Sequence, residues 1–317
     1  VSLTQSLDWD VLLGRRSALA KANNQVAYND YRRAVQQVLA EADEQFTSLV
    51  YYNKLCGELS QRQTLAEEIE RLYQQKFECG DINQLEVNNV RLNASVCRAD
   101  WARAHNERQQ ILANLQRLNG GHAVAFTDTV YPLAGKALPP LVDFQSALAG
   151  SLAVQTAQAA VAQSEAEIKV AKAEGLPALT VGFQGEYIKQ NNYSGLSLGF
   201  SVPIWGNSRK KIRKAEAELA ANRLTVDDVI YQERAQVAKL YASAQQLQQA
   251  ANALQKDMQL MNNDQLLRRS LELGQISLLD YLLELSFYYT ARTSQLEAER
   301  DAQLAVSALK SKIIIKY

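Results

Sequence analysis

The sequence predicts a mainly helical protein with a small amount of β-structure, built from two tandem repeats. Three observations carry this prediction: few helix-breaking residues, a heptad pattern of apolar residues, and similarity between the two halves of the chain. Only five Pro and fourteen Gly occur in 317 residues, and helix-favouring residues are abundant. No Gly or Pro lies between Asn207 and Leu273, and only Gly57 lies between Arg15 and Cys79. Each stretch can therefore form one long helix.

The two halves of the chain match with a shift of about 194 residues, the separation of Gly80 and Gly274. A second match lies upstream, where residues 3–10 align with residues 198–205. These two markers keep nearly the same separation in both halves, so the repeated unit is a long structural element. We therefore divide the chain into a first repeat, 1–118, a linker, 119–141, and a second repeat, 142–317.

The first repeat is expected to contain a strand, a long helix, a tip turn at residue 80 and a return helix. Leu3, Leu7 and Trp9 alternate with small or polar residues, which is the pattern of a strand with one apolar face. The linker 119–141 contains Gly, Thr, Asp and two consecutive Pro. These residues favour turns and end regular helices.

The second repeat is expected to contain a complete set of elements. They are a helix over 142–175, a β-hairpin over 177–205, a long helix over 207–273, a tip turn over 274–277 and a return helix over 278–315. In the long helix, two rows of residues each recur every seven positions, three positions apart: Val237, Ala244, Ala251 and Met258, then Leu240, Leu247, Leu254 and Met261. This is the seam of a coiled coil, here between antiparallel helices.

The hairpin is the feature that a plain coiled coil does not explain. Apolar residues alternate with small or polar ones in both strands, as in Leu179, Val181 and Phe183 and again in Leu198 and Phe200. A hairpin alone is marginally stable, so these strands must join others. Strands of about ten residues with one apolar and one polar face fit a membrane β-barrel with a polar lumen. A small soluble sheet that caps the helices is the alternative.

Aromatic residues lie near the ends of the expected strands. They are Trp9, Tyr187, Tyr193 and Trp205. Membrane barrels carry girdles of aromatic residues at both interfaces with water. These four residues are therefore candidates for such a girdle.

Several segments, taken in order and duplicated, resemble one known family across essentially the whole chain. The segments are Leu176–Gly182, Gly195–Gly206, Ala215–Ala217 and Leu273–Leu282. Their order and spacing resemble the TolC family of outer-membrane efflux proteins, also called outer membrane factors. The second hairpin strand with its Pro203-Ile204-Trp205 ending is most similar to the heavy-metal and cation efflux branch typified by CusC and CzcC.

The resemblance implies a homotrimer in the outer membrane of a Gram-negative bacterium. Each protomer would contribute strands to one trimeric β-barrel in contact with membrane lipid. Its long antiparallel helices would contribute to a periplasmic α-barrel that forms a tunnel. Family members contribute four strands per protomer, so the chain is expected to be N-terminally truncated and to lack the first helix and strand of its first repeat.

The function implied by the resemblance is that of the exit duct of a tripartite efflux system. The duct would passively conduct a metal cation or a drug, passed on by an inner-membrane pump of the RND type and a periplasmic adaptor, to the outside. A cation substrate would make it a heavy-metal resistance protein. The alternative is a soluble coiled-coil scaffold or adaptor with a small β-domain.

The sequence shows no pattern of an enzyme, and we expect no catalytic residue, cofactor or metal. His105 and His122 lie far apart, and neither has a Cys or carboxylate at metal-ligand spacing. The 34 basic residues balance 34 acidic ones, so no basic footprint for nucleic acid exists.

The two tip turns are the expected functional sites. By the resemblance they form the tunnel mouth and dock the adaptor through Gly80, Asp81 and Ile82, and through Gly274, Gln275, Ile276, Ser277 and Leu278. Gly lets the chain reverse tightly and lets a partner backbone approach. Leu85, Leu278 and Leu279 are expected to anchor the return helices.

Acidic residues near the turns have two interpretations. Asp81, Glu86 and Asp280 are candidates for a carboxylate-lined constriction, as in cation-selective pores. The other interpretation is that they only favour the start of the return helix through its dipole.

Overall fold

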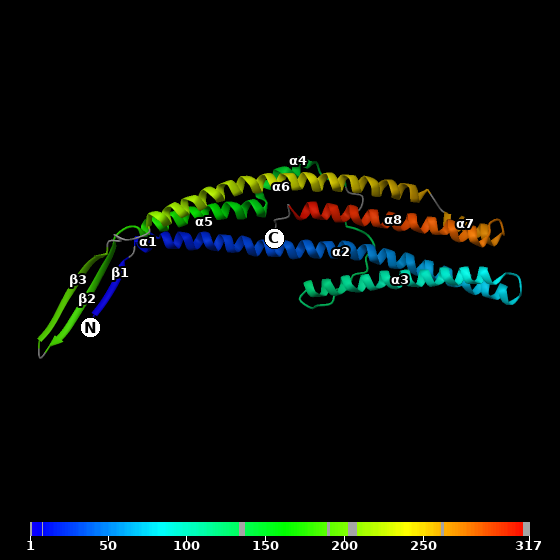
Figure 1. Ribbon diagram of the computed structural model, residues 1–317, viewed down its shortest axis with the longest axis horizontal. Coiled ribbons are helices and arrows are strands. Elements are labelled where there is room, and N and C mark those ends of the chain that lie inside the picture. The colour runs from blue at the N-terminus through cyan, green and yellow to red at the C-terminus, as the bar shows by residue number, and fades with distance from the viewer. Residues whose placement is uncertain are drawn as a thin grey trace. The chain divides into compact units, whose positions relative to one another are not determined.

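A computed structural model describes residues 2–7, 9–132, 137–188, 191–201, 208–260 and 263–312. It consists of long helices and one small sheet (Figure 1), which confirms the mainly helical prediction. The elements in chain order are β1 Ser2–Leu7, α1 Trp9–Leu12, α2 Arg15–Glu78, α3 Gln84–Leu118, α4 Leu141–Ala147, α5 Leu152–Glu174, β2 Ala178–Ile188, β3 Asn191–Ser201, α6 Ser208–Gln259, α7 Asn263–Glu272 and α8 Leu278–Ser311.

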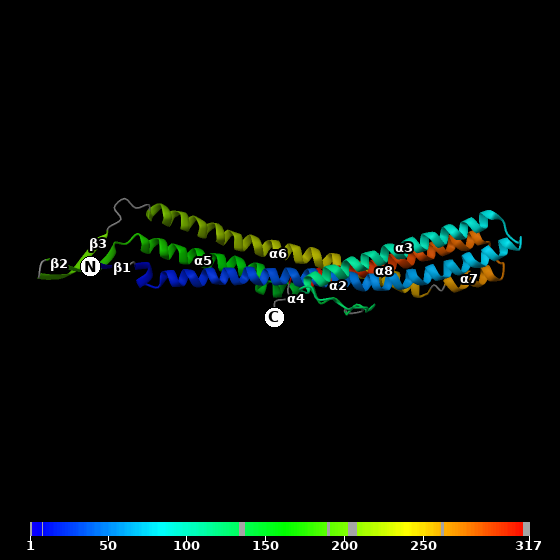
Figure 2. The ribbon, with the colours of Figure 1, turned by 90° about the horizontal axis from the view of Figure 1, so that it is seen from below.

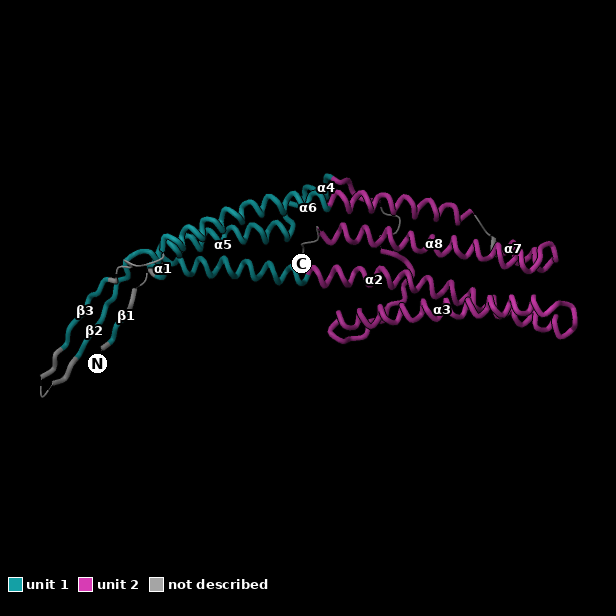
Figure 3. The backbone as a smooth tube through the Cα atoms, viewed as in Figure 1, with its two compact units in different colours: residues 1–35, 142–236, 315–317 teal, residues 36–141, 237–314 magenta. Residues whose placement is uncertain are grey.

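The chain divides into two compact units (Figure 3). Unit 1 comprises residues 1–35, 142–236 and 315–317, and unit 2 comprises residues 36–141 and 237–314. Helices α2 and α6 each pass from one unit into the other. Within the described residues, no helix combines the length and the apolar character that crossing a membrane requires.

The sheet of unit 1 is antiparallel and has the strand order β1-β2-β3. Leu3 lies opposite Phe183, which in turn lies opposite Leu196. Because side chains alternate between faces along a strand, one face collects the apolar residues. They are Leu3, Leu179, Val181, Phe183, Leu196, Leu198 and Phe200. Leu196 is 82% exposed and Phe200 76%, so this face is open.

The opposite face of the sheet carries small and polar residues. Thr4, Gly182 and Ser197 form a row across the three strands. A Cβ atom added to Gly182 would lie 2.5 Å from Ser197 Oγ and 2.6 Å from Thr4 Cγ2, so the row has no room for a larger residue at its centre.

Part of the predicted aromatic girdle lies outside the described residues. This applies to Trp205 and to the side chains of Tyr187 and Tyr193, as it does to residues 202–205 of the predicted hairpin. Trp9 is described, and its Nε1 donates a hydrogen bond of 2.6 Å to the carbonyl of Pro177. This bond ties α1 to the residue that precedes β2.

In unit 1, α5 lies between the first part of α2 and the first part of α6 (Figures 1 and 2). On the α6 side, Asn222 Nδ2 donates to Ser164 Oγ at 2.8 Å. On the α2 side, the buried Asn29 donates to the carbonyl of Gln155 at 3.3 Å. Polar side chains thus join the three helices beside small buried residues such as Ala166 of α5.

The predicted single helix over 142–175 is wrong. The chain forms α4, then a 3-10 turn over Leu148–Gly150, and resumes as α5 at Leu152. Ser151 caps the new helix, since its Oγ accepts a hydrogen bond of 3.4 Å from the Val154 amide. A Gly followed by a good capping residue favours this restart over a continuous helix.

The predicted helix over 207–273 is also interrupted. Helix α6 ends at Gln259 and the chain resumes as α7 at Asn263, while residues 261 and 262 lie outside the described residues. Asn and Asp at 262–264 are poor helix formers that favour helix starts. The last helix ends at Ser311 instead of 315, and residues 313–315 lie outside the described residues.

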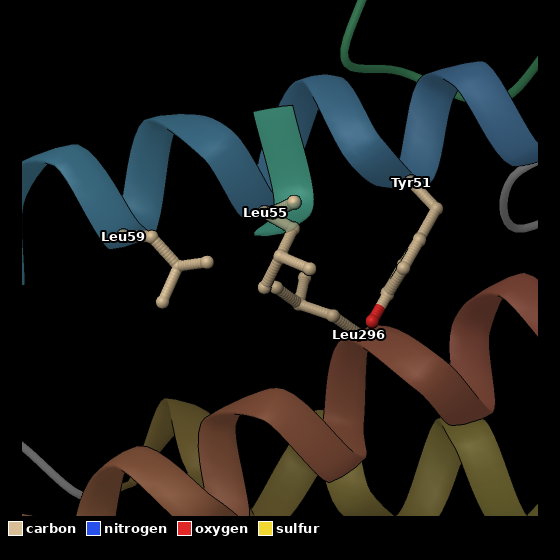
Figure 4. Close-up of a cluster of buried hydrophobic side chains, with 5 residues drawn as sticks. Tyr51, Leu55, Leu59 and Leu296 are labelled. Atoms are coloured by element: carbon tan, nitrogen blue, oxygen red, sulfur yellow. The ribbon is translucent and has the colours of Figure 1, made fainter. Parts of the chain in front are cut away.

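Unit 2 is a bundle in which α2, α3 and α8 share a hydrophobic cluster. Its buried members come from α2 (Tyr51, Leu55 and Leu59), α3 (Ala104) and α8 (Leu296). Figure 4 shows the Leu296 side chain of α8 directed toward Leu55 of α2, with Leu59 and the Tyr51 ring on either side. In α6, the predicted heptad row is confirmed, because Val237, Ala244, Ala251 and Met258 are all buried. The second row, Leu240, Leu247 and Leu254, is partly buried, and Met261 lies outside the described residues.

The linker after α3 packs along α2 of unit 2. Phe126 lies edge-on to Phe46, with ring centroids 5.3 Å apart. Asn53 Nδ2 donates to the carbonyl of Asp128 at 3.0 Å, and Asn53 Oδ1 accepts from Arg108 Nε at 2.6 Å. One asparagine therefore joins the linker, α2 and α3.

Candidate functional site

The first tip turn, which follows α2, is built around Gly80. Its φ of +82° is in the left-handed region that favours glycine. The Gly80 amide donates to the carbonyl of Phe77 and the Asp81 amide to that of Lys76, both at 2.9 Å. This pair of bonds is a Schellman motif, which satisfies the last carbonyls of a helix.

The second tip turn, between α7 and α8, repeats this geometry at Gly274. Its φ is +69°. The Gly274 amide donates to the carbonyl of Leu271 at 3.0 Å, and the Gln275 amide to that of Ser270 at 2.9 Å. A Cβ atom at Gly80 or Gly274 would meet nothing within 4 Å, so backbone conformation, and not crowding, is what requires glycine at these two positions.

Both return helices begin with a capping box. At the first tip, Asn83 Oδ1 accepts from the Glu86 amide at 3.0 Å and Glu86 Oε2 accepts from the Asn83 amide at 3.1 Å. At the second tip, Ser277 Oγ accepts from the Asp280 amide at 3.2 Å and Asp280 Oδ2 accepts from the Ser277 amide at 3.4 Å. Each acid thus satisfies an amide at the start of its helix, which favours the helix-start interpretation for Glu86 and Asp280.

The two turns rest on one hydrophobic cluster, the tip cluster. Its buried members are Tyr73, Val90, Leu278, Tyr281 and Leu285, and Ile82 and Ile276 of the two turns pack against it. Both turns lie at the same end of unit 2 (Figures 1 and 2). The structure therefore brings together the predicted residues of the two tips.

Tyr73 is a buried titratable residue of the tip cluster. Burial raises the pKa of its hydroxyl, and the nearby Glu86 carboxylate raises it further. The hydroxyl therefore stays neutral at physiological pH.

Two of the three expected anchors of the return helices are wrong. Leu278 is buried, but Leu85 is 68% exposed and Leu279 is 67% exposed. Leu278, Tyr281 and Leu285 follow the spacing of one helix face, and Leu279 falls on another. The sequence interpretation missed Tyr281, which is fully buried, although its position three residues after Leu278 could have indicated it.

Exposed apolar residues recur at equivalent positions of the two tips. Leu72 matches Leu266 and Leu85 matches Leu279, with the shift of 194 residues that relates the repeats, and all four are exposed. The predicted turn residues Asp81 and Gln275 are exposed between them. Each tip thus presents apolar side chains beside an open polar turn.

Nothing in the described part of the chain groups three His, Cys, Asp or Glu residues as a metal would require. His105 stacks on Trp101 with ring centroids 4.9 Å apart, which is a packing role. Cys56, Cys79 and Cys97 are free thiols.

Comparison with known proteins gives a family and a fold. The model of the family described as outer membrane efflux protein matches residues 144–313. No curated protein sequence matches the chain. Solved structures with this fold include CusC, at 18% identity and a TM-score of 0.82, with 98% of this chain and 76% of CusC covered.

Two further outer-membrane channels share the fold. CmeC of Campylobacter jejuni matches at 15% identity and a TM-score of 0.81, over 98% of this chain and 70% of its own. MtrE of Neisseria gonorrhoeae, solved in its open state, matches at 17% identity and a TM-score of 0.78, over 99% of this chain and 78% of its own.

The family match identifies the protein as an outer-membrane exit duct of an efflux system, and not as a soluble scaffold. The matched segment contains the β2–β3 hairpin, the first part of α6 and the second tip, which are the elements on which the resemblance in the sequence depends. Since the match covers more than half of the chain, this protein belongs to the outer membrane efflux protein family.

Proposed function

We propose that three copies of this chain form one continuous duct, with a β-barrel in the outer membrane and a helical tunnel in the periplasm. The observation that carries the proposal is the open apolar face of the sheet. Leu196, Leu198 and Phe200 are all more than two-thirds exposed, and each such side chain loses about 1.5–3 kcal/mol by staying in water. Lipid is the environment that removes this cost.

The other face and the edges of the sheet support the same arrangement. The row of Thr4, Gly182 and Ser197 suits a water-filled lumen. Strands β1 and β3 are the two edges of the sheet, and unpaired edges in lipid are unfavourable unless neighbouring strands close them into a barrel. Strands of the other copies would provide that closure.

The tip turns are the proposed docking site for a periplasmic adaptor, which in turn connects to an inner-membrane pump. The residues are Gly80, Asp81 and Ile82 with Gly274, Gln275, Ile276, Ser277 and Leu278. Two equivalent turns on one hydrophobic cluster give the tip a defined shape. Exposed apolar residues beside the turns provide contact area for a partner.

Conduction through the duct would be passive and without a catalytic step. Three acids are proposed for a constriction. Glu86 and Asp280 each accept a hydrogen bond in a capping box, whereas Asp81 belongs to neither capping box. Asp81 is therefore the acid best placed to attract a cation. A metal cation is preferred to a drug as the substrate, because Pro203–Trp205 resemble the heavy-metal and cation efflux branch of the family. These three residues lie outside the described residues.

Site-specific photo-crosslinking tests the docking site in cells that contain the matching adaptor. A photoreactive residue is placed at Asp81, at Gln275 and, as the control, at Tyr231, which is exposed and lies on α6 in unit 1. We expect crosslinks to the adaptor from Asp81 and Gln275 and none from Tyr231. Equal crosslinking at all three positions, or none at the tips, would contradict docking there.

A further inference from the structure

The middle of the seam between helices α2 and α8 in unit 2 contains four contacts, each of which includes one cation. The cation comes alternately from α8, α2, α8 and α2. In order along α2, the contacts are Arg300 over the Tyr51 ring, Lys54 with Glu299, Arg292 with Glu58, and Arg62 over the Tyr289 ring. Since α2 belongs to the first repeat and α8 to the second, this seam joins the two repeats.

The two central contacts are short ion pairs. Lys54 Nζ lies 2.8 Å from both carboxylate oxygens of Glu299. Arg292 donates to Glu58 Oε1 from Nη2 at 2.6 Å and from Nε at 3.0 Å. All four side chains are less than a third exposed, so each pair is partly removed from water.

The order of charges along the seam specifies one register. Arg292 and Glu299 are seven residues apart, which is one heptad. If α8 slid by one heptad in one direction, Arg292 would face Lys54, and in the other direction Glu299 would face Glu58. Both alternatives place like charges together, whereas an apolar heptad seam would tolerate either slip.

The same four residues line a cavity. Its volume is about 420 Å³, and Gln295 and Asn53 are among its other lining residues. A polar cavity of this size holds water, so dissolved ions can reach both pairs. The tip cluster, in contrast, is made of apolar and aromatic side chains.

We propose that the Lys54–Glu299 and Glu58–Arg292 pairs form an ion-sensitive latch that sets the register of α8 on α2 and holds the two repeats together.

The test is a charge-reversal cycle read out as a distance between α2 and α8. The full chain, with its three native Cys replaced, carries spin labels at Ser60 and Ser294, which are exposed on the two helices. We expect K54E and E299K each to lower the population at the wild-type distance on the order of threefold, and the double variant K54E/E299K to restore it. Salt at about 1 M, where the Debye length is about 3 Å, should shift the wild type in the same direction as the single variants.

The matched control is R98E. Arg98 pairs with Glu67 at 3.4 Å between α2 and α3, so it lies within the first repeat and its reversal should leave the α2–α8 distance unchanged. If circular dichroism shows that a charge-reversal variant does not fold, the uncharged single variants K54M and E299Q are used instead. We expect them to lower the population at the wild-type distance by a smaller amount. A wild-type distance in both single variants, or no restoration in the double variant, would overturn the latch.

The channel function is tested separately, by the conductance of the wild type in a lipid bilayer. If the wild type shows no conductance but the double variant K54E/E299K restores the distance that each single variant disturbs, the duct is refuted and the latch is kept. A conducting wild type with no charge-reversal effect would refute the latch and keep the duct.

Discussion

The two tip turns have nearly the same backbone but different side chains. Gly80 and Gly274 both adopt a positive φ and end their helices with a Schellman motif. The capping residues differ, with Asn83 and Glu86 at one tip and Ser277 and Asp280 at the other. The geometry of the tips therefore depends on a glycine and a capping box, whereas the exposed residues are free to diverge.

The largest effect is expected from Tyr281→Ala, because this fully buried residue belongs to the cluster under both turns. Loss of a large core side chain costs about 3–5 kcal/mol. Hydrogen exchange should accelerate at both tips, not only at the second. Leu279→Ala is the control, since Leu279 is exposed, and it should change stability by less than about 0.5 kcal/mol. Faster exchange at the second tip alone would mean that the turns are independent.

Gly80→Ala and Gly274→Ala should each destabilise their own turn by about 1–2 kcal/mol, the cost of a left-handed conformation with a Cβ atom. The two values should agree, because both sites are sterically open. Gly57→Ala is the matched control inside α2, also with open space around it, and it should stabilise by about 0.5–1 kcal/mol. Denaturant unfolding measures all three, and a neutral effect at either tip would contradict the positive φ.

Asn83→Ala and Ser277→Ala remove the two capping side chains. Each should cost about 1 kcal/mol, with faster hydrogen exchange in the first turn of α3 or α8. The effects should add in the double variant within about 0.5 kcal/mol if the two caps act independently. Strong non-additivity would show that the caps communicate through the tip cluster.

Asp81→Asn and Gln275→Glu exchange the charge character of the two turns and should have the smallest effect on stability, within about 0.5 kcal/mol, since both side chains are exposed. Their effect should appear in ion selectivity. Asp81→Asn should lower the preference for cations in bilayer recordings and Gln275→Glu should raise it. Unchanged selectivity in both variants would remove Asp81 from the proposed constriction.

The tips could be predicted in position because their signals are local. A glycine after a long helical stretch, followed by Asn or Ser and an acid three residues later, is a helix end and a helix start. These signals could not predict which apolar residues of the return helices face the core. Leu85 and Leu279 are as apolar as Leu278, and only the phase of the return helix decides which of them is buried.

The helix interruptions were harder to predict than the turns. Neither Gly nor Pro marks the end of α6 at Gln259, so the sequence favoured one continuous helix. The strands followed from alternation of apolar and polar residues, but the pairing of β1 with β2 joins residues far apart in the chain. The ion pairs between α2 and α8 are also non-local, and no local pattern indicates that Lys54 faces Glu299.

Whether this protein is an outer-membrane exit duct is tested by the bilayer conductance of the protein purified in detergent from outer membranes. We expect a trimer that needs detergent to remain dispersed and that opens a water-filled pathway for ions across the bilayer. A protein that stays dispersed without detergent and leaves the bilayer impermeable would contradict it.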